Sequence, residues 1–572
     1  MPIEKIPLRL QFALYWLMIL TGLFIGSVML HWLGISITPF HLPLVALASV
    51  MICWKISFGD ERSLSLAMLV VTLVLFFAAV FIFGRFVALV SEYSYLGRGA
   101  YSDGIIALTS GWNPIFDGKT HLSELVYRSP RATWYVNSVL LSFLGEYEMA
   151  KQQTILFAVP AFFLTWHYFL AFTKQQRGMS FLLALISICS PVALSQLFTF
   201  YDDAAMAYVL QCMLLLMCYL LDAEKINRTI LFVLSGVWIF LFHMPQNGSR
   251  MAIVLAIGFF MVMAYRYGKW VFRWGAMRFG FVAFFCVVVF GYQPMIQSII
   301  DRQPIFSLYF QNLLYVQQQE IPGILEGQPR VLQGLLSLMA TPEETTQWIY
   351  HPYIKLMGIG SSGFATPDVL LQGFGALSLL LFFFTLIALL YVAIFLRGTT
   401  EAVFEPEMLD GAVAVEERFT GETAIHSMPI EGHFFSFYRQ FWFMVVMMVT
   451  IICSSPQPWL ARTIAIAWFF IPLSMAFLSR QYSAMSLSLI KVMLVLVLVN
   501  VVLFACVSFP RIVDKSHEIA HFWQRMSQEE LPTKEDAQTF NTYHEDFPSW
   551  SAMKQSGREP WKEKAIMNKV IK

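Results

Sequence analysis

The chain has 572 residues, of which 58% are hydrophobic and only 13% are charged. Soluble domains carry about 25% charged residues, so this composition excludes an ordinary soluble protein and indicates a polytopic membrane protein. The formal net charge of +1 gives no sign of a nucleic-acid partner. All seven cysteines lie in apolar stretches without metal-ligand spacing, so neither a disulfide framework nor a zinc site is predicted.

Apolar stretches long enough for membrane helices recur along the chain. A bilayer core of about 30 Å needs roughly 20 apolar residues per helix, and lipid leaves unpaired backbone polar groups unsatisfied. The alternating pattern of a lipid-facing barrel is missing from the sequence, so we expect an all-α fold with about thirteen transmembrane helices. The expected spans are 10–33, 40–56, 64–90, 155–173, 180–200, 204–221, 229–244, 249–265, 279–296, 369–396, 438–454, 462–479 and 485–508.

The spans divide the chain into two membrane regions and two polar segments. The main region, 1–396, contains two long loops, and a second helical region follows. The acid-rich segment between these regions has no apolar period, which is typical of a flexible cytoplasmic connector. The tail mixes both charges and could be an amphipathic cap on the membrane or a partner-binding segment. The two long loops of the main region are 91–154 and 293–368. The acidic connector is 397–437, the second helical region 438–508 and the tail 509–572.

Short basic loops set the expected orientation. Lysines and arginines concentrate between alternate spans, at residues 5–9, 55–62, 174–177, 225–228, 266–278 and 397. Cytoplasmic loops are enriched in these residues, so one cytoplasmic face explains all of them. The segments expected on the opposite, extracytoplasmic face are the loop 91–154, the corner 201–203, the turns 243–250 and 454–462, the segment 293–368 and the tail.

The first large loop combines acids with aromatic residues. They include Glu92, Asp103, Tyr101, Trp112 and Trp134. Aromatic rings offer flat apolar faces to a sugar, and a nearby carboxylate can take a proton from a hydroxyl. The alternative is an interfacial aromatic belt with solvated acids. Asp103 is the first choice for a general base, because the following Ile-Ile-Ala-Leu run predicts a short helix that Asp103 would cap. Glu92 is the second choice.

Two further acids and two arginines are candidates for the same site. Asp202 and Asp203 lie at the joint between two apolar helices, where a helix N-terminus stabilises negative charge and adjacent acids usually face a cavity or water. Helix capping alone accounts for one of them. Arg131 and Arg462 are the basic counterparts, because a guanidinium can hold a phosphate in a fixed, forked geometry. The alternative for each arginine is snorkelling to lipid headgroups.

Several segments resemble, in the same order, a family of bacterial multi-spanning glycosyltransferases with the GT-C architecture. They are YSDGIIALTSGWNPIFD with YRSPRATW, TFYDDAAMA, GYQPMIQSIIDRQPIFSLY, LLQGFGALSLLLFF and PWLARTIAIAWFFIPL. The resemblance covers about three quarters of the chain and leaves out the acidic connector and the tail. It implies an enzyme of the bacterial cytoplasmic (inner) membrane that acts in cell-surface polysaccharide synthesis. Such an enzyme takes a sugar from a polyprenyl-phosphate carrier on the extracytoplasmic side and attaches it to a glycan or lipid.

The resemblance also implies roles for individual residues. Asp103 or Glu92 would be the base, Asp203 the second acid, and Arg131 and Arg462 would lie near the carrier phosphate. We expect inverting transfer, in which a carboxylate takes the proton of the acceptor hydroxyl while arginines stabilise the departing phosphate. No cofactor and no metal are expected, and a divalent ion held by Asp103 and Asp203 is the alternative.

The first loop departs from the family pattern, because Ser102 follows Tyr101 where the family has a Tyr-His pair. Either Asp103 has taken the place of the family's acid, or the chain has a binding or assembly role without catalysis. A transporter or flippase of lipid-linked oligosaccharides and a polymerase of such oligosaccharides are further alternatives. A secondary transporter should show an internal repeat and broken helices at the membrane midplane. The sequence indicates neither.

Overall fold

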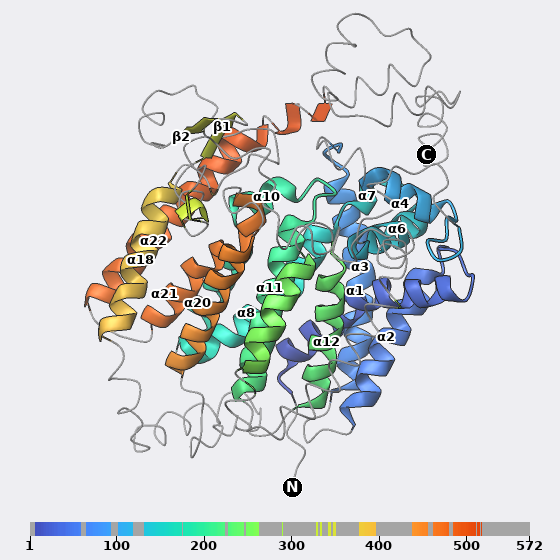
Figure 1. The fold of residues 1–572 in the computed structure, drawn as a ribbon, viewed down its shortest axis with the longest axis horizontal. Helices are drawn as coiled ribbons and strands as arrows, with labels where there is room; N and C mark the ends of the chain where they lie inside the picture. The colour runs from blue at the N-terminus through green and yellow to red at the C-terminus, as the bar shows by residue number, and fades with distance from the viewer. Residues whose placement is uncertain are drawn as a thin grey trace, which may run out of the picture.

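The structure is a bundle of α-helices, shown in Figure 1. It is a computed structural model that describes residues 6–58, 64–92, 101–117, 131–173, 176–222, 227–244, 248–261, 263, 289, 328–329, 332–334, 341–344, 347–349, 374, 377–395, 437–455, 461–479, 484–510, 512–514 and 516–517. Its helices are α1 (Leu8–Trp32), α2 (His41–Ser57), α3 (Leu66–Val87), α4 (Ser102–Thr109), α6 (Ala132–Leu144), α7 (Tyr147–Ala150), α8 (Gln153–Phe172), α9 (Arg177–Ile188), α10 (Pro191–Gln196), α11 (Asp203–Asp222), α12 (Arg228–Phe242), α18 (Ser378–Phe395), α20 (Phe437–Ser454), the 3-10 helix η6 (Ala461–Phe469), α21 (Phe470–Leu478), α22 (Ala484–Leu503) and the π-helix η7 (Phe504–Ser508). Two short antiparallel strands, β1 (Thr341–Glu344) and β2 (Gln347–Ile349), are the exception to this helical architecture in the described ranges.

The helical prediction is confirmed, and many helices are apolar enough for a membrane. Among the described residues, five helices have the length and composition to cross a bilayer: Leu8–Trp32, Leu66–Val87, Tyr147–Leu170, Asp203–Leu221 and Met485–Cys506. Others are apolar but shorter, at 10–17 residues. The total of about thirteen spans stays a prediction. The expected span 279–296 and the connector 397–437 lie outside the continuously described residues.

Helix α11 occupies the middle of the bundle. It packs against α8, α12, α10 and η6. Its most apolar window is 94% buried, whereas the corresponding windows of α3 and α22 are 28% and 33% buried. A helix that is apolar all round and buried belongs to the core, whereas apolar helices exposed on one side are typical of a lipid-facing periphery. Figure 1 shows α18 and α22 at one side of the bundle and α2 at the other.

Helices α1 and α2 approach each other closely through small residues. A Cβ at Gly22 would meet Ser49, and a Cβ at Gly26 would lie 2.8 Å from Cγ1 of Val45. Both glycines lie on one face of α1 because they are four residues apart. This spacing is the small-xxx-small arrangement that lets membrane helices pack backbone to backbone.

The single helix expected at 180–200 is wrong. The chain forms α9 and α10 instead, with a break at Cys189 and Ser190. The Ser190 hydroxyl accepts a hydrogen bond from the Ala193 N–H at 3.0 Å, and Pro191 follows at the first helical position. A serine cap followed by proline starts a new helix, which the apolar run concealed.

The first large loop contains a buried helix that the sequence analysis missed. All side chains from Ala132 to Leu141 in α6 are buried. The helix ends at Gly145, whose φ of +74° is the left-handed conformation that glycine adopts at helix C-termini. The loop 91–154 is therefore partly folded into the bundle. Helices α4, α7 and α10 lie at the upper end of the bundle in Figure 1, with α4 and α7 next to each other.

Arg9, from the first basic loop, lies at the opposite end of the bundle. The Arg9 guanidinium, near the start of α1, lies 4.0 Å from the centre of the Trp166 ring. At the same end, the Ser65 N–H donates to the Gln11 side chain at 2.9 Å. Arg9 also lies close enough to Arg177 for their charges to interact, as expected for two basic loops that the charge pattern assigns to one face.

Candidate functional site

Four segments that are far apart in the sequence meet at the end of the bundle formed by α4, α7 and α10. Three hydrogen bonds join these segments. They run from the Tyr101 hydroxyl to Asp202 Oδ1 at 3.2 Å, from the Ala132 N–H to the His243 carbonyl at 2.9 Å, and from Arg250 Nη1 to the Ser454 carbonyl at 2.8 Å. The first loop, the 201–203 corner and the turns near 243–250 and 454–462 therefore share one end, as the charge pattern predicted.

The acidic pair is buried at the start of α11. Asp203 is the first residue of this 20-residue helix and Asp202 directly precedes it. Their exposed fractions are 1% and 2%. A buried carboxylate needs hydrogen bonds or nearby positive charge, and the N-terminus of a long helix supplies part of that. The Tyr101 hydroxyl supplies a further donor to Asp202.

The corner before α11 is held by two buried glutamines. Gln153, at the start of α8, donates through Nε2 to the carbonyls of Phe200 at 2.8 Å and Tyr201 at 2.9 Å. Gln196, at the end of α10, accepts from the Ala204 N–H at 2.8 Å. Because backbone groups on both sides of the acids are bonded, the position of the acidic pair is fixed by α8 and α10.

Asp103 lies in the first turn of α4 and is partly exposed. The prediction that it caps this helix is wrong, because α4 begins at Ser102 and the cap position belongs to Tyr101. A carboxylate in the first turn is still favoured by the helix dipole. Asp103 follows the Asp202-bound tyrosine by two residues, so the contact between Tyr101 and Asp202 brings both acidic segments to one place.

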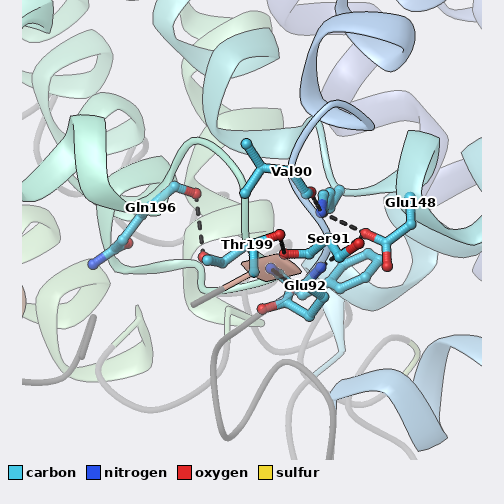
Figure 2. Close-up of polar contacts among 9 residues, drawn as sticks. Val90, Ser91, Glu92, Glu148, Gln196 and Thr199 are labelled. Carbon is cyan, nitrogen blue, oxygen red and sulfur yellow. Dashed lines mark hydrogen bonds and ion pairs between the residues drawn. The ribbon is translucent and has the colours of Figure 1, made fainter. Parts of the chain in front are cut away.

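Glu92 is buried against the same corner. Its carboxylate accepts a hydrogen bond from the Phe200 N–H at 2.7 Å, and its own N–H donates to Glu148 Oε2 at 3.0 Å. Figure 2 shows Glu92 between Glu148 and the Thr199 segment. A carboxylate bonded to the backbone in this way is suited to hold a segment in place, whereas Asp103 is partly exposed.

The predicted aromatic residues form the packing around α4. The Tyr101 ring lies 5.7 Å from that of Trp134 and 6.0 Å from that of Tyr201. Trp134 is 1% exposed, and Gly104 of α4 lies directly against its ring. In this arrangement Trp134 serves as a platform for α4, so its ring faces contact protein.

Arg131 stands at the start of α6, beside Trp112. Its guanidinium lies 4.9 Å from the centre of the Trp112 ring, in a cation–π arrangement, and the residue is buried. Arg462 lies in η6, and its side chain is outside the described residues. Arg250 is a third arginine at this end, which the sequence analysis missed, and it is 3% exposed. An arginine in a short turn between apolar runs was the signal that could have found it.

The turn that contains Trp112 is anchored to the end of α1. Asn113 Nδ2 donates to the His31 carbonyl at 2.8 Å, and the Asn113 N–H donates to Asp117 Oδ2 at 2.7 Å. His31 Nδ1 lies 2.9 Å from the Tyr135 hydroxyl of α6. These polar residues connect α1, α6 and the first loop, and His31, Asn113 and Tyr135 were not singled out from the sequence.

The described residues contain no group of three or more His, Cys, Asp or Glu side chains placed to hold a metal ion. Comparison with protein-family models, with curated proteins and with solved structures finds no match to this chain.

Proposed function

We propose that this chain is a membrane glycosyltransferase of the GT-C type. It would move a sugar from a polyprenyl-phosphate donor to a glycan or lipid acceptor, on the extracytoplasmic face of the bacterial cytoplasmic membrane. The observation that carries the proposal is the hydrogen bond between Tyr101 and Asp202, which joins the first-loop segment containing Asp103 to the acidic corner. That contact brings acids from two distant segments of the sequence to one place.

In the proposed reaction Asp103 is the general base. It takes the proton of the acceptor hydroxyl as the oxygen attacks the anomeric carbon, on the face opposite the carrier phosphate. The bond between the anomeric carbon and the phosphate oxygen then breaks, and the polyprenyl phosphate leaves as an anion. The partly exposed position of Asp103 supports this assignment, since a base must reach the substrate.

Arginines stabilise the leaving phosphate in this proposal. Arg131 and Arg250 are buried at the same end as the acids, and both come from turns that meet near His243. Fixed positive charge at the departing oxygen lowers the barrier because it interacts most strongly with the charge that grows in the transition state. Arg462 is kept as a candidate from the sequence.

The test is a transfer assay with purified protein in lipid nanodiscs. The donors are radiolabelled polyprenyl-phosphate monosaccharides, and the acceptor is a total glycolipid extract. Asp103→Asn and Asp203→Asn should lower kcat by about 10²- to 10⁴-fold, the usual effect of removing a positioned acid or base. Glu146→Gln is the matched control, because Glu146 lies at the same end but is 45% exposed. Full activity in both aspartate variants would contradict the assignment of the acids.

A transporter of lipid-linked oligosaccharides is the alternative function. The expected span 180–200 is broken into α9 and α10, but α10 lies at the end of the bundle, whereas transporter binding sites have broken helices near the membrane midplane. Vesicles with fluorescent lipid-linked oligosaccharide distinguish the two functions. Movement of the lipid without a new covalent product would support the transporter, whereas a sugar-extended product would support the transferase.

A further inference from the structure

The joint between α7 and α8 carries charged and polar side chains that the proposed chemistry does not use. They are Glu148, Lys151 and Gln153. The Lys151 side chain is 0% exposed, although lysine is among the residues that are almost never fully buried unless paired. A fully desolvated ammonium at this position requires a specific partner and raises the question of what it holds in place.

Lys151 binds two groups at the exit of α3. Its Nζ lies 2.5 Å from Glu148 Oε2 and also donates to the Val90 carbonyl. Val90 lies just beyond the C-terminus of α3, where backbone carbonyls favour a positive charge. Lys151 therefore fixes the path of the chain as it leaves α3 toward Glu92.

Glu148 and Glu92 continue this line of contacts to the acidic corner. Glu148 Oε2 accepts from the Glu92 N–H at 3.0 Å, and Glu92 Oε2 accepts from the Phe200 N–H at 2.7 Å. Figure 2 shows these side chains as one connected group. The contacts run from Lys151 through two carboxylates to the backbone two residues before Asp202.

Phe200 is held from its other side by the same joint. Gln153 Nε2 donates to its carbonyl, and Gln153 Oε1 accepts from Asn137 Nδ2 at 2.8 Å. The Tyr147 ring packs on the Phe200 ring with 4.8 Å between centroids. The joint at 147–153 therefore holds the carbonyl and the ring of Phe200 directly. It holds the Phe200 N–H through Glu92, which is bonded to Glu148.

We propose that Lys151 is a positioning residue for the Asp202–Asp203 corner. It holds Val90 and Glu148, these hold Glu92, and the Glu92 carboxylate fixes the Phe200 backbone. The effect of this arrangement on sugar transfer rests on the proposed function, whereas its effect on the structure of the corner does not. The two parts can be measured separately.

The structural part is tested by hydrogen–deuterium exchange of the intact protein in nanodiscs. Lys151→Met should increase amide exchange in the peptide 198–203 by at least about tenfold, because a buried, charge-assisted network loses its donor. If Lys151→Met does not fold, Lys151→Gln takes its place in the same measurement. Glutamine keeps a hydrogen-bond donor for the Val90 carbonyl but removes the charge that pairs with Glu148. Arg85→Gln is the control, since it removes the exposed ion pair with Glu146 at 3.5 Å and should leave exchange unchanged. Unchanged exchange in the lysine variants would overturn the proposal.

The functional part is tested by measuring kcat and KM separately for a Lys151 variant. Misplacing the acids should lower kcat by about 10- to 100-fold in a folded Lys151 variant, with KM changed by less than about twofold. A purely structural role would reduce the amount of folded protein without this change in kcat per folded molecule. If wild-type protein transfers no sugar, the proposed function fails while the exchange result still decides the role of Lys151. An active Lys151 variant with wild-type kcat would refute the positioning role.

Discussion

At the scale of single residues, the contact between Tyr101 and Asp202 is the key observation. It connects the first loop to the start of α11 across 101 residues of sequence. Hydrogen bonds to buried charged groups are stronger than those between neutral groups, since the charge has lost its water. The tyrosine therefore both stabilises a buried carboxylate and orients the segment that leads to Asp103.

Tyr101→Phe removes this hydrogen bond while leaving the ring packing against Trp134 in place. We expect a loss of about 1.5–3 kcal/mol in the free energy of unfolding, the usual contribution of a hydrogen bond to a charged group. The kcat of sugar transfer should fall as well. Thermal unfolding of the purified protein measures the stability, and the transfer assay measures kcat. Tyr15→Phe is the control, because the Tyr15 hydroxyl donates to the neutral Ser65 carbonyl at 3.3 Å at the opposite end of the bundle. Equal effects of the two variants on kcat would argue against a special role for Tyr101.

At the scale of elements, α4 depends on a glycine for its contact with α6. A Cβ at Gly104 would lie 2.4 Å from Cε3 of Trp134, which is far inside van der Waals contact. The tryptophan ring is rigid and fully buried, so it has no room to move aside. Because Gly104 has no side chain, α4 can lie directly against Trp134, and this contact sets the position of Asp103.

Gly104→Ala should displace α4 and destabilise the protein by about 1–3 kcal/mol, the usual cost of overpacking a core. Thermal unfolding measures the stability, and the sugar-transfer assay measures the displacement of Asp103. Gly178→Ala is the matched control, because a Cβ there meets nothing within 4 Å in the first turn of α9. That variant should be neutral or slightly stabilising, since alanine favours a helix over glycine. A neutral Gly104→Ala variant would show that α4 does not rest on Trp134.

A second close approach joins α1 to α2. Gly26→Val places a branched side chain where Val45 Cγ1 already lies 2.8 Å from a single Cβ. We expect the two helices to separate, with a loss of stability of at least about 1–3 kcal/mol. Unfolding by denaturant in nanodiscs measures this loss. An unchanged midpoint would mean that α1 and α2 do not depend on close backbone packing.

At the scale of the whole molecule, the described end of the chain returns to the candidate site. Ile512 packs in a small apolar cluster with Val87, Val90 and Tyr201. The Ser516 hydroxyl donates to the Ser91 carbonyl at 3.2 Å. Ile512 and Ser516 of the tail therefore contact protein at the exit of α3, next to the acidic corner.

Ile512→Asp should disturb the exit of α3 from the other end of the chain. Placing an unpaired charge among buried apolar side chains is among the most destabilising changes, so we expect a loss of more than about 2 kcal/mol in stability. Exchange in the peptide 87–92 should rise with it. Asp514→Asn changes an exposed neighbour and serves as the control. Wild-type exchange in Ile512→Asp would show that the tail does not support the site.

The sequence identified parts of the site but not the contacts that organise it. Apolar runs predicted most helices. Asp202 and Asp203 were singled out because adjacent acids between two apolar helices are conspicuous, and Asp103 because it lies among aromatic residues before a short apolar run. Lys151 and Gln153 were missed, since each lies at the start of an apolar helix and resembles an ordinary polar boundary. The break at Ser190 was missed because the apolar run continues through it.

Local pattern by itself determined the helical, apolar architecture of this protein, because the need to bury apolar side chains and pair backbone groups acts on each segment separately. Only the tertiary structure decided which polar side chains meet. The contacts of Lys151 with Val90, of Tyr101 with Asp202 and of Glu92 with Phe200 join residues 61, 101 and 108 positions apart. Such pairings depend on how whole helices pack against one another, and no local sequence period encodes them.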